Sequence, residues 1–586
     1  MTTDFHIVSR MKNRKIKMKP FTKFYLSILY LSFSFTAPWS ADSNTPAPTL
    51  VSAKDHPTVS GRLQGLIASE NPNEILKIWV YFTDKGIFEE KGYLGKLQEQ
   101  KQILLPKNLS RRAKSKEKEV VDFYDLPVYS SYIKQVTQLG AKLNYVSRWL
   151  NAASFYVPVG KIESISILGF IKSIKPVEIL VRQPEPIEES QVEAEVIKTL
   201  GGTALNYGPS LNQLQLLNIP AVHSLGFKGQ GVLVCMMDTG FRKNHQAFQI
   251  AYNEGRVLDE YDFINHDNNV QDDSADSPGQ HSHGTSCWSI LGGEKDGTLY
   301  GPAFKADFIL AKTEYVPTET RIEEDNWVAG AEWADSLGAD IISSSLGYYD
   351  FPQNPDTFSY TYSDLNGDVA VTTIAADVAA SKGILVSNAM GNSGPGAGSL
   401  ITPADADSII ACGAVDSFGV IVGFSSRGPT SDGRIKPELV AQGSSVYKAS
   451  SLDTLTYNRG GGTSFATPLL GGCAAVLLSA RPNLNNMQVR EAMMESANNV
   501  GSPNNNYGWG MPDMLLALRY SFINGDVNTD NNINLADIIS LVNYFFKGGL
   551  APHPVKVGDV NCDTSVGLTD IVYLVNYVFK SGPFPC

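Results

Sequence analysis

Four strand-like stretches, the first of them a continuous apolar run, set the strongest limit on how this chain can fold. They span residues 231–237, 340–347, 383–392 and 408–415. Strands that are apolar on both faces are typical of a parallel sheet covered by helices on both sides. Helix-like stretches alternate with these runs from about residue 206 to residue 520, and this alternation predicts an α/β fold.

Three polar residues stand where the predicted strands end or a predicted helix begins. Asp238 directly follows the first stretch, and Asn392 ends the third. His283 precedes a helix-like stretch at residues 286–291. Open α/β sheets bind ligands at the carboxyl ends of their strands, so these residues are candidates for a functional site.

A serine in a glycine-rich setting, Ser464 within residues 462–468 (GTSFATP), adds a candidate nucleophile. Glycine allows backbone and substrate to approach closely, and a helix N-terminus favours developing negative charge. Pro468 suits a first helical turn, where its missing N–H costs nothing. Taken alone, the stretch also fits a loop that caps a core helix. Asp238, His283 and Ser464, in that order, supply an orienting carboxylate, a base and a nucleophile.

These motifs give the chain a resemblance to the subtilisin-like (subtilase) serine proteases. The matching residues are 238–240 (DTG), 283–285 (HGT) and 462–468, and the resemblance runs from about residue 207 to 520. It implies a subtilisin-like parallel sheet flanked by helices. It also implies Ser464 as nucleophile, His283 as general base and then acid, Asp238 as orienting carboxylate and Asn392 as oxyanion donor. Family substrate-binding positions match Ser345, Leu346, Gly347 and Gly391.

The N-terminal region has the features of an export signal. Basic residues precede a short apolar run at 24–35 and then small residues up to Ala41. This order is typical of a secretory signal peptide, and the run is short for a membrane span. We therefore expect a signal peptide at 1–41, a flexible leader at 42–74, secretion, and no stable membrane span after signal removal. The net charge of −12 argues against a nucleic-acid binder.

Residues 75–178 show a β-α-β-β-α-β pattern that predicts a small split βαβ (ferredoxin-like) domain. By the family resemblance it is similar to an inhibitory, fold-assisting propeptide. Its lysine- and arginine-rich insert at 90–119 is expected to be a solvated loop or helix. A Glu- and Pro-containing stretch follows, so we expect a linker and processing region at 179–205 before a catalytic domain at 206–520.

The C-terminal region, residues 521–586, contains two similar twelve-residue stretches that begin 33 residues apart. Their oxygen-bearing side chains have calcium-loop spacing. The candidate ligands are Asp526, Asn528, Asp530, Asn532, Asn534 and Asp537 in the first, and Asp559, Asn561, Asp563, Ser565 and Asp570 in the second. Each stretch runs into a helix with one apolar face, and the two units resemble an all-α dockerin type I module that binds Ca²⁺.

Two details of this module concern its binding partner and a disulfide bond within it. Many dockerins carry a Ser/Thr pair at loop positions 10 and 11, where this chain has Leu535-Ala536 and Leu568-Thr569. Cohesin binding therefore remains an open alternative to a calcium-dependent clasp on the catalytic domain. Cys562 and Cys586 are the only cysteines of the region and are expected to pair.

Other chemically active side chains have simpler interpretations. Cys235, Cys287, Cys412 and Cys473 fall on predicted core elements, which indicates buried free thiols. His281 could line the site, but a solvated loop histidine is the favoured interpretation. The Asp/Asn-rich stretch 262–276 is either a second calcium site or a plain acidic loop.

The sequence thus predicts a secreted serine endopeptidase, made as a pro-enzyme, that hydrolyses protein or peptide substrates through an acyl-enzyme on Ser464. Its partner would be a cohesin-like or cell-surface molecule. The alternative is a non-catalytic surface or assembly protein that uses the C-terminal module for attachment. That alternative predicts the loss of a triad residue or of Asn392, and all four are present.

Overall fold

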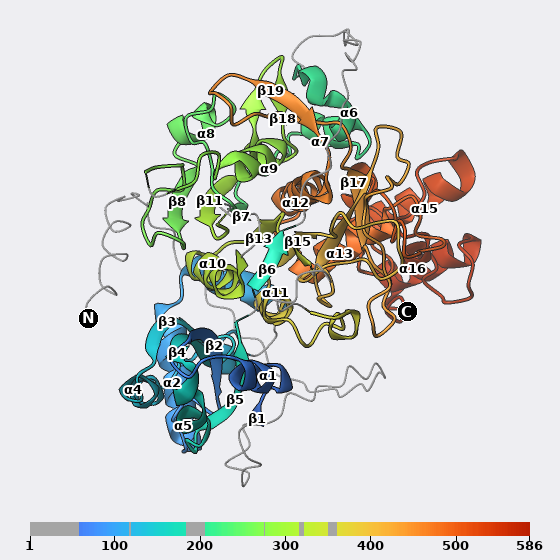
Figure 1. Ribbon diagram of the computed structural model, residues 1–586. Helices are drawn as coiled ribbons and strands as arrows, with labels where there is room; N and C mark the ends of the chain where they lie inside the picture. Colours follow the sequence, from blue (N-terminus) through green and yellow to red (C-terminus); the bar gives the residue numbers. More distant parts are fainter. Residues whose placement is uncertain are drawn as a thin grey trace, which may run out of the picture. The chain divides into compact units, whose positions relative to one another are not determined.

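The computed structural model describes residues 58–115, 119–177, 179–182, 205–274, 276–315, 322–349 and 360–586 (Figure 1). The predicted signal peptide, the leader up to residue 57 and the linker at 183–204 lie outside these residues. The elements below are those of the described parts of the chain.

The N-terminal part forms a five-stranded sheet in the order β1-β5-β2-β4-β3. Its strands are β1 Thr58–Val59, β2 Ile75–Phe82, β3 Lys142–Ser147, β4 Ala152–Pro158 and β5 Ile171–Pro176. Its helices are α1 Gly61–Ser69, α2 Glu90–Ile103, α3 Pro106–Ser115, α4 Ser130–Gln138 and α5 Ile162–Ser166. The predicted β-α-β-β-α-β order corresponds to β2, α4, β3, β4, α5 and β5, so the alternation of apolar residues located these elements correctly.

The expectation of a flexible leader up to residue 74 is wrong for its last part. β1 pairs with β5, and Leu63 and Leu66 of α1 are buried in the core of this sheet. The side chain of Ser60 accepts a hydrogen bond from the Leu63 N–H at 3.3 Å and caps α1. Two buried leucines and a capped helix therefore extend this domain toward residue 58.

A seven-stranded sheet forms the centre of the largest part of the chain, with the order β17-β16-β15-β13-β7-β11-β8 and parallel pairing throughout. Its strands are β7 Leu233–Asp238, β8 Val257–Asp262, β11 Asp307–Lys312, β13 Ile341–Ser344, β15 Leu385–Ala389, β16 Ile410–Val415 and β17 Leu439–Gln442. The four predicted strands are β7, β13, β15 and β16. The predicted parallel α/β fold is confirmed.

Helices cover both faces of this sheet. One face packs against α9 Ser282–Gly292, α12 Thr463–Ala480 and α13 Asn486–Glu495, and the other against α10 Glu324–Leu337 and α11 Val371–Ser381. Shorter elements are α6 Leu211–Gln215, α7 Ile219–Ser224, α8 Gln249–Asn253, α14 Met514–Ala517, β9 Glu294–Lys295, β10 Leu299–Tyr300, β12 Ile322–Glu323, β14 Tyr348–Tyr349, β18 Val446–Ala449 and β19 Tyr457–Gly460.

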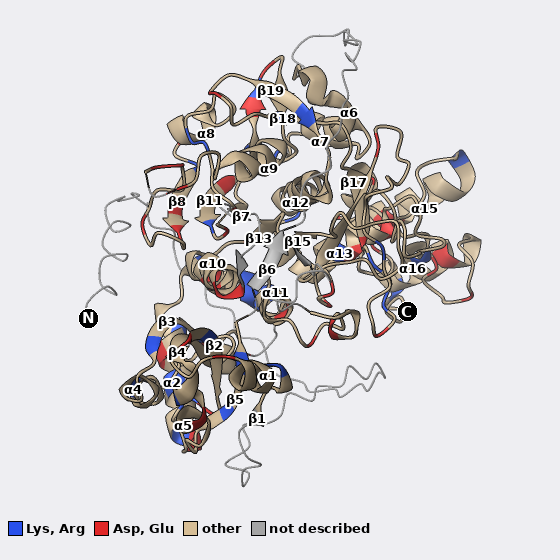
Figure 2. Cartoon of the chain, in the orientation of Figure 1, with Lys and Arg blue, Asp and Glu red and all other residues tan. Residues whose placement is uncertain are grey.

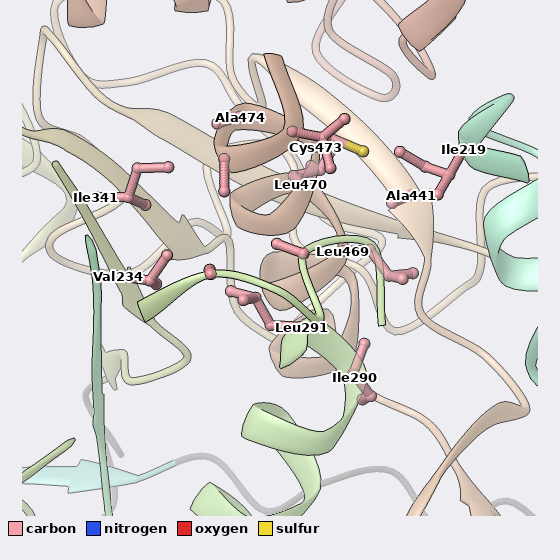
Figure 3. Packing of buried hydrophobic residues seen from close by; sticks show 14 of the residues in the cluster. Ile219, Val234, Ile290, Leu291, Ile341, Ala441, Leu469, Leu470, Cys473 and Ala474 are labelled. Carbon is pink, nitrogen blue, oxygen red and sulfur yellow. The ribbon is translucent and has the colours of Figure 1, made fainter. Parts of the chain in front are cut away.

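Helix α12 is the central helix of the larger core. Leu469, Leu470, Cys473 and Ala474 pack with residues of the sheet such as Val234 (Figure 3). By length and composition α12 could cross a membrane, but 89% of its apolar window is buried inside the protein. Its hydrophobicity is therefore explained by core packing.

The C-terminal part contains two helices, α15 Leu535–Lys547 and α16 Leu568–Lys580, each preceded by one of the two acidic loops. Ile538, Leu541, Ile571 and Leu574 form its small core with Val527 and Val560. The predicted apolar faces of both helices thus pack against each other.

Candidate active site

The sheet topology brings the candidate catalytic residues to one edge. Asp238 is the last residue of strand β7, and Ser345 follows the neighbouring strand β13, which is the central strand of the sheet. Asn392 follows β15, the next strand across the sheet. His283 and Ser464 are each the second residue of a helix, α9 and α12 respectively.

His283 and Asp238 form a direct buried pair. His283 Nδ1 lies 2.7 Å from Asp238 Oδ1, and the Thr239 N–H donates to the same oxygen at 2.7 Å. The close approach of α9 to β7 requires glycine at position 284, where a Cβ would lie 2.2 Å from the Gly240 carbonyl oxygen. The pairing fixes the imidazole orientation and presents Nε2 on the other side of the ring.

Ser464 sits where α12 begins, and its backbone contacts differ from those of a regular helix. Pro468 lies inside α12 rather than in its first turn, so that part of the sequence interpretation is wrong. Proline cannot donate the helical hydrogen bond to the carbonyl four residues earlier, which is that of Ser464. This carbonyl instead accepts from Ser345 Oγ at 2.8 Å and from Cys287 Sγ at 3.5 Å. The side chain of Ser464 donates to the Ser345 carbonyl at 3.2 Å.

Thr463 orients the side chain of Asn392. Its N–H and its hydroxyl donate to Asn392 Oδ1 at 2.9 and 3.0 Å. The Thr463 hydroxyl also accepts from the Gly391 N–H at 3.1 Å. Because Oδ1 is held by Thr463, the amide group of Asn392 has a fixed direction near the N-terminus of α12. Sequence reasoning missed Thr463, although it precedes the nucleophile candidate in the same motif.

A segment from the N-terminal part is paired beside the Ser345–Gly347 edge. Strand β6, Ile179–Arg182, lies antiparallel between β12 and β14, and β14 directly follows Gly347. Tyr348 of β14 is opposite Arg182 in the register. An extended backbone therefore occupies this neighbourhood by strand addition.

The two acidic loops near the C-terminus each gather three carboxylates. Ligand atoms of Asp526, Asp530 and Asp537 lie within 4.8 Å of one another, and those of Asp559, Asp563 and Asp570 do the same. The other predicted ligands lie in the same loops. In the first loop, the Asn528 amide and the Asn532 backbone N–H donate to Asp530, and Asn534 caps α15. In the second loop, the Asn561 amide and the Ser565 backbone N–H donate to Asp563. Such oxygen-rich clusters fit a hard cation such as Ca²⁺.

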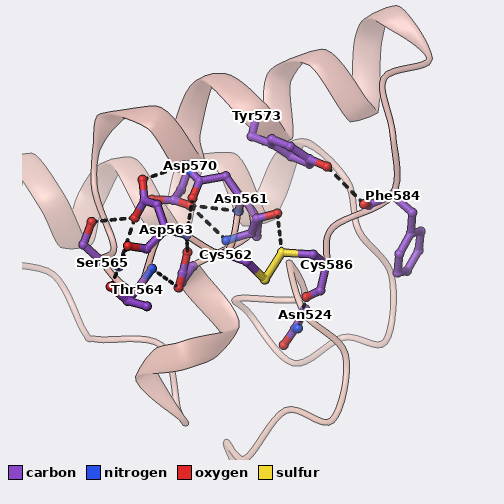
Figure 4. The surroundings of a disulfide bond; sticks show 12 residues. Asn524, Asn561, Cys562, Asp563, Thr564, Ser565, Asp570, Tyr573, Phe584 and Cys586 are labelled. Atoms are coloured by element: carbon purple, nitrogen blue, oxygen red, sulfur yellow. Dashed lines mark hydrogen bonds between the residues drawn. A yellow bond between two sulfur atoms is a disulfide. The ribbon is translucent and has the colours of Figure 1, made fainter. Parts of the chain in front are cut away.

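The second loop is closed by a disulfide between Cys562 and Cys586, so the expected pairing is confirmed (Figure 4). The Cys586 N–H donates to the Val560 carbonyl at 3.3 Å, and the Tyr573 hydroxyl donates to the Phe584 carbonyl at 3.2 Å. These bonds tie the last residues of the chain to the second loop and to α16.

Comparison with known proteins identifies the catalytic part. Residues 229–510 match the family model "Subtilase family". A subtilisin from Bacillus pumilus is 33% identical over 312 residues, which cover 52% of this chain and 96% of that protein. The chain belongs to the subtilase family. Subtilisin E from Bacillus subtilis (strain 168) is 32% identical over 308 residues, covering 52% of this chain and 70% of that protein.

The flanking parts of this subtilase match two further families. Residues 77–192 match "Peptidase S8 propeptide domain, Bacteroidota", and residues 524–579 match "Dockerin type I domain". Among solved structures, fervidolysin from Fervidobacterium pennivorans, a keratinolytic enzyme related to subtilisin, has a TM-score of 0.54 and 19% identity. The alignment covers 77% of this chain and 61% of fervidolysin, and at this identity it shows the fold alone. The chain is thus a serine endopeptidase with a propeptide domain and a dockerin domain.

His281 and His245, which lie outside the Asp238–His283 pair, are also buried in the subtilase domain. His281, expected in a solvated loop, is only 5% exposed, and its Nδ1 lies 2.8 Å from Asp272 Oδ1. His245 is fully buried, and burial lowers its pKa. The prediction that His281 is a solvent-exposed loop histidine is wrong, because the loop folds back and buries the Asp272–His281 pair.

Two aspartates of the acidic loop 262–276 pair with a lysine of the protein. The ammonium group of Lys312 lies 2.8 Å from Asp262 Oδ2 and also pairs with Asp276. Lys312 is fully buried, so a protein cation already compensates both carboxylates. We therefore assign no metal to these two aspartates.

The four predicted free thiols are buried, as expected. Cys287 lies closest to the site, with Sγ 3.8 Å from both ring nitrogens of His283. Burial raises the pKa of Cys287, which keeps the sulfur protonated and weakly nucleophilic. This contrast favours Ser464 as the nucleophile.

Proposed function

We propose that this subtilase is a secreted pro-enzyme that cleaves proteins by forming an acyl-enzyme on Ser464. The observation that carries the proposal is the buried His283–Asp238 pair, at the same edge of the sheet as a serine at the N-terminus of α12. In this mechanism His283 takes the proton of the Ser464 hydroxyl as Oγ attacks the peptide carbonyl. Asp238 orients the ring and stabilises the imidazolium that forms.

The remaining steps use the same residues. The Asn392 amide and the Ser464 N–H stabilise the negative charge on the carbonyl oxygen of the tetrahedral intermediate. His283 then gives its proton to the leaving amine, and the peptide carbonyl carbon stays bonded to Oγ. A water molecule, deprotonated by His283, hydrolyses this ester and restores the free hydroxyl of Ser464.

Substrate binding is proposed to use Ser345, Leu346, Gly347 and Gly391. The pairing of β6 with β14 supports this role, because it shows an extended strand added next to the same edge. It also supports latency, because the N-terminal domain supplies that strand. The domain boundaries proposed from the sequence are kept, except that the pro-segment begins near residue 58 and includes β6, residues 179–182, which had been assigned to the linker.

Substitution of Ser464 by alanine tests the mechanism. Ser464→Ala should abolish hydrolysis of casein and labelling by a fluorophosphonate probe, whereas Ser502→Ala, at an exposed serine of the same domain, should change neither. Casein cleavage by purified Ser464→Ala protein at the wild-type rate would refute the assignment.

We further propose that the dockerin domain binds Ca²⁺ and a cohesin-like or cell-surface partner. An exposed apolar face supports this proposal because it repeats in both halves: Leu535, Ile539 and Phe546 correspond to Leu568, Val572 and Phe579 at the 33-residue offset, and each is at least half exposed. Exposed apolar patches of this kind mark interaction sites.

The full-length Ser464→Ala chain is a suitable bait for this partner, since it cannot degrade what it binds. A cohesin-like protein or a cell-wall fraction should be captured with Ca²⁺ and released by EDTA. Calcium-dependent stabilisation without capture of either would favour the intramolecular clasp.

A further inference from the structure

The lysine- and arginine-rich insert of the pro-segment contains a helix that contacts the catalytic domain. Its first helix, α2, has no buried residue, in line with the predicted solvated insert. Its second helix, α3, buries Asn108, Arg111 and Arg112, and here the prediction is wrong. Two fully buried neighbouring arginines need compensating partners, and those partners define what α3 binds.

Helix α3 contacts the ends of two catalytic-domain helices. Gly338 and Gly383 follow α10 and α11 with φ values of +83° and +86°. A Cβ on Gly338 would lie 3.3 Å from Lys107 Cβ, and one on Gly383 would lie 3.3 Å from the Arg111 carbonyl oxygen. Both helices therefore end in a left-handed glycine that leaves room for α3.

Arg111 binds the negative ends of both helices. Its Nε donates to the Lys382 carbonyl at 3.1 Å, and its other nitrogens donate to the Ala339 carbonyl and to Asp335. Carbonyl groups at a helix C-terminus lack helical partners and carry partial negative charge, so a guanidinium is favoured there.

Arg112 completes the charge balance around Asp335. It lies 2.7 Å from Asp335 Oδ2 and 2.8 Å from Asp125 Oδ1. Asp335 is fully buried in the last turn of α10, one of the acidic residues that this helix carries (Figure 2). Burial alone would raise the pKa of Asp335, but Arg111, Arg112 and Arg148 together lower it. All three of these arginines belong to the pro-segment.

The contact continues beyond the arginine pair. Lys382 of the catalytic domain pairs with Asp125 at 2.7 Å and with Asp122. The hydroxyl of Ser115 donates to Asn486 Oδ1 at 3.3 Å, at the start of α13. These residues are separate from β6, which lies beside the Ser345–Gly347 edge.

We propose that the ends of α10 and α11 form an arginine-binding exosite, and that α3 of the cleaved pro-segment is its occupant. After the chain is cut between pro-segment and catalytic domain, Arg111 and Arg112 of α3 then hold the fragment on the catalytic domain. The proposal rests on the pro-enzyme assignment above.

The test measures retention of the fragment without using catalysis. A cleavage sequence for an unrelated protease is inserted among residues 183–204 of the full-length Ser464→Ala chain, and the cut protein is passed over a size-exclusion column. The fragment should co-elute with the rest of the chain. Arg111→Gln/Arg112→Gln should weaken its retention on the order of a hundredfold, as expected when one side of a buried ion pair is removed.

The control Lys91→Gln/Lys101→Gln makes the same charge change on exposed α2 and should retain the fragment. The proposal of an exosite would be refuted if the Arg111→Gln/Arg112→Gln variant retained the fragment as well as the parent chain does. It would also be refuted if the cut parent chain lost the fragment immediately. Because the chain is inactive by design, these outcomes are independent of the Ser464 mechanism.

A second variant tests the same contact in case the arginine variant does not fold. Ser115→Cys/Asn486→Cys should form a disulfide that keeps the cut fragment attached on a non-reducing gel until a reductant is added. Absence of this cross-link in folded protein would show that α3 does not occupy the site.

Discussion

The carbonyl oxygen of Ser464 accepts a hydrogen bond from the hydroxyl of Ser345 at 2.8 Å, in place of the helical bond that Pro468 cannot donate. The backbone of Ser464, the proposed nucleophile, is thus held by the strand edge that is proposed to bind substrate. Ser345 and Ser464 are both buried, so water does not readily replace this bond.

Removing that hydroxyl should destabilise the domain. Ser345→Ala is expected to lower the free energy of unfolding by about 1–3 kcal/mol, the usual cost of weakening the hydrogen bonding of a buried carbonyl. Urea unfolding in the Ser464→Ala background avoids autolysis and measures this cost.

A second substitution tests whether Pro468 is the reason that the Ser464 carbonyl depends on the Ser345 hydroxyl. Pro468→Ala restores an N–H four residues after Ser464, so Ser345→Ala/Pro468→Ala should recover a large part of the lost stability. Strictly additive effects of the two changes would contradict the explanation.

Thr463 is expected to act on the reaction by positioning Asn392. Thr463→Val removes the hydroxyl that contacts Asn392 Oδ1 at 3.0 Å but keeps the backbone N–H bond at 2.9 Å. We expect kcat to fall about tenfold with KM nearly unchanged, because an oxyanion donor acts mainly in the transition state and Asn392 keeps one of its two contacts. Asn392→Leu, which removes the donor, should cost about a hundredfold or more.

A purely structural role of Thr463 predicts a different pattern. In that case Thr463→Val would lower stability and raise KM as much as it lowers kcat. The same valine change in an Asn392→Leu background should have little further effect on kcat if Thr463 acts through Asn392.

The sequence predicted those parts of the site that depend on local pattern. β7 lies in a continuous apolar run and β15 in a strand-like stretch, and Asp238 and Asn392 end or follow them, so their placement at one sheet edge follows from parallel topology. β8 was missed because it lies at the sheet edge, where only Asp262 of its six residues is fully buried.

Contacts between distant residues could not be predicted in this way. Arg111 and Asp335 are 224 positions apart, and nothing local distinguishes Arg111 from the exposed lysines of α2. Lys312 likewise looks like a strand-end lysine until β8 and its loop bring Asp262 and Asp276 to it. Buried charge pairs depend on tertiary structure, whereas apolar periodicity is already visible in the sequence.

Calcium binding to the dockerin domain should depend on the last aspartate of each loop. Asp537 and Asp570 are fully buried and accept backbone N–H bonds from Asn528 and Val560, at 3.0 and 2.9 Å. Asp537→Asn and Asp570→Asn should each remove one of two bound Ca²⁺ ions in calorimetric titration, because the carboxylate charge at this position is a main ligand.

Asp368→Asn, at an exposed aspartate outside the loops, is the matched control and should bind both ions. EDTA should lower the unfolding temperature of the parent chain and have a smaller effect on the Asp537→Asn/Asp570→Asn chain. Two ions bound by that double variant would refute the ligand assignment.

His223 should make the catalytic domain sensitive to acid. It is buried, its Nδ1 lies 2.9 Å from the Tyr207 hydroxyl, and its Nε2 lies 2.7 Å from the Pro302 carbonyl. Burial lowers the pKa of His223 from 6.5 to about 4. The unfolded chain therefore takes up this proton first as the pH falls, and the folded state loses stability between pH 6.5 and pH 4, by about 3 kcal/mol in total.

The substitution His223→Gln removes the titrating group and keeps an amide that can donate to the Pro302 carbonyl. Its free energy of unfolding, measured in urea in the Ser464→Ala background, should be lower than that of the parent at pH 7.5 and should approach the parent value at pH 4. His266→Asn, at an exposed histidine, should follow the parent at every pH. A constant difference between His223→Gln and the parent from pH 7.5 to pH 4 would show that His223 does not carry this acid sensitivity.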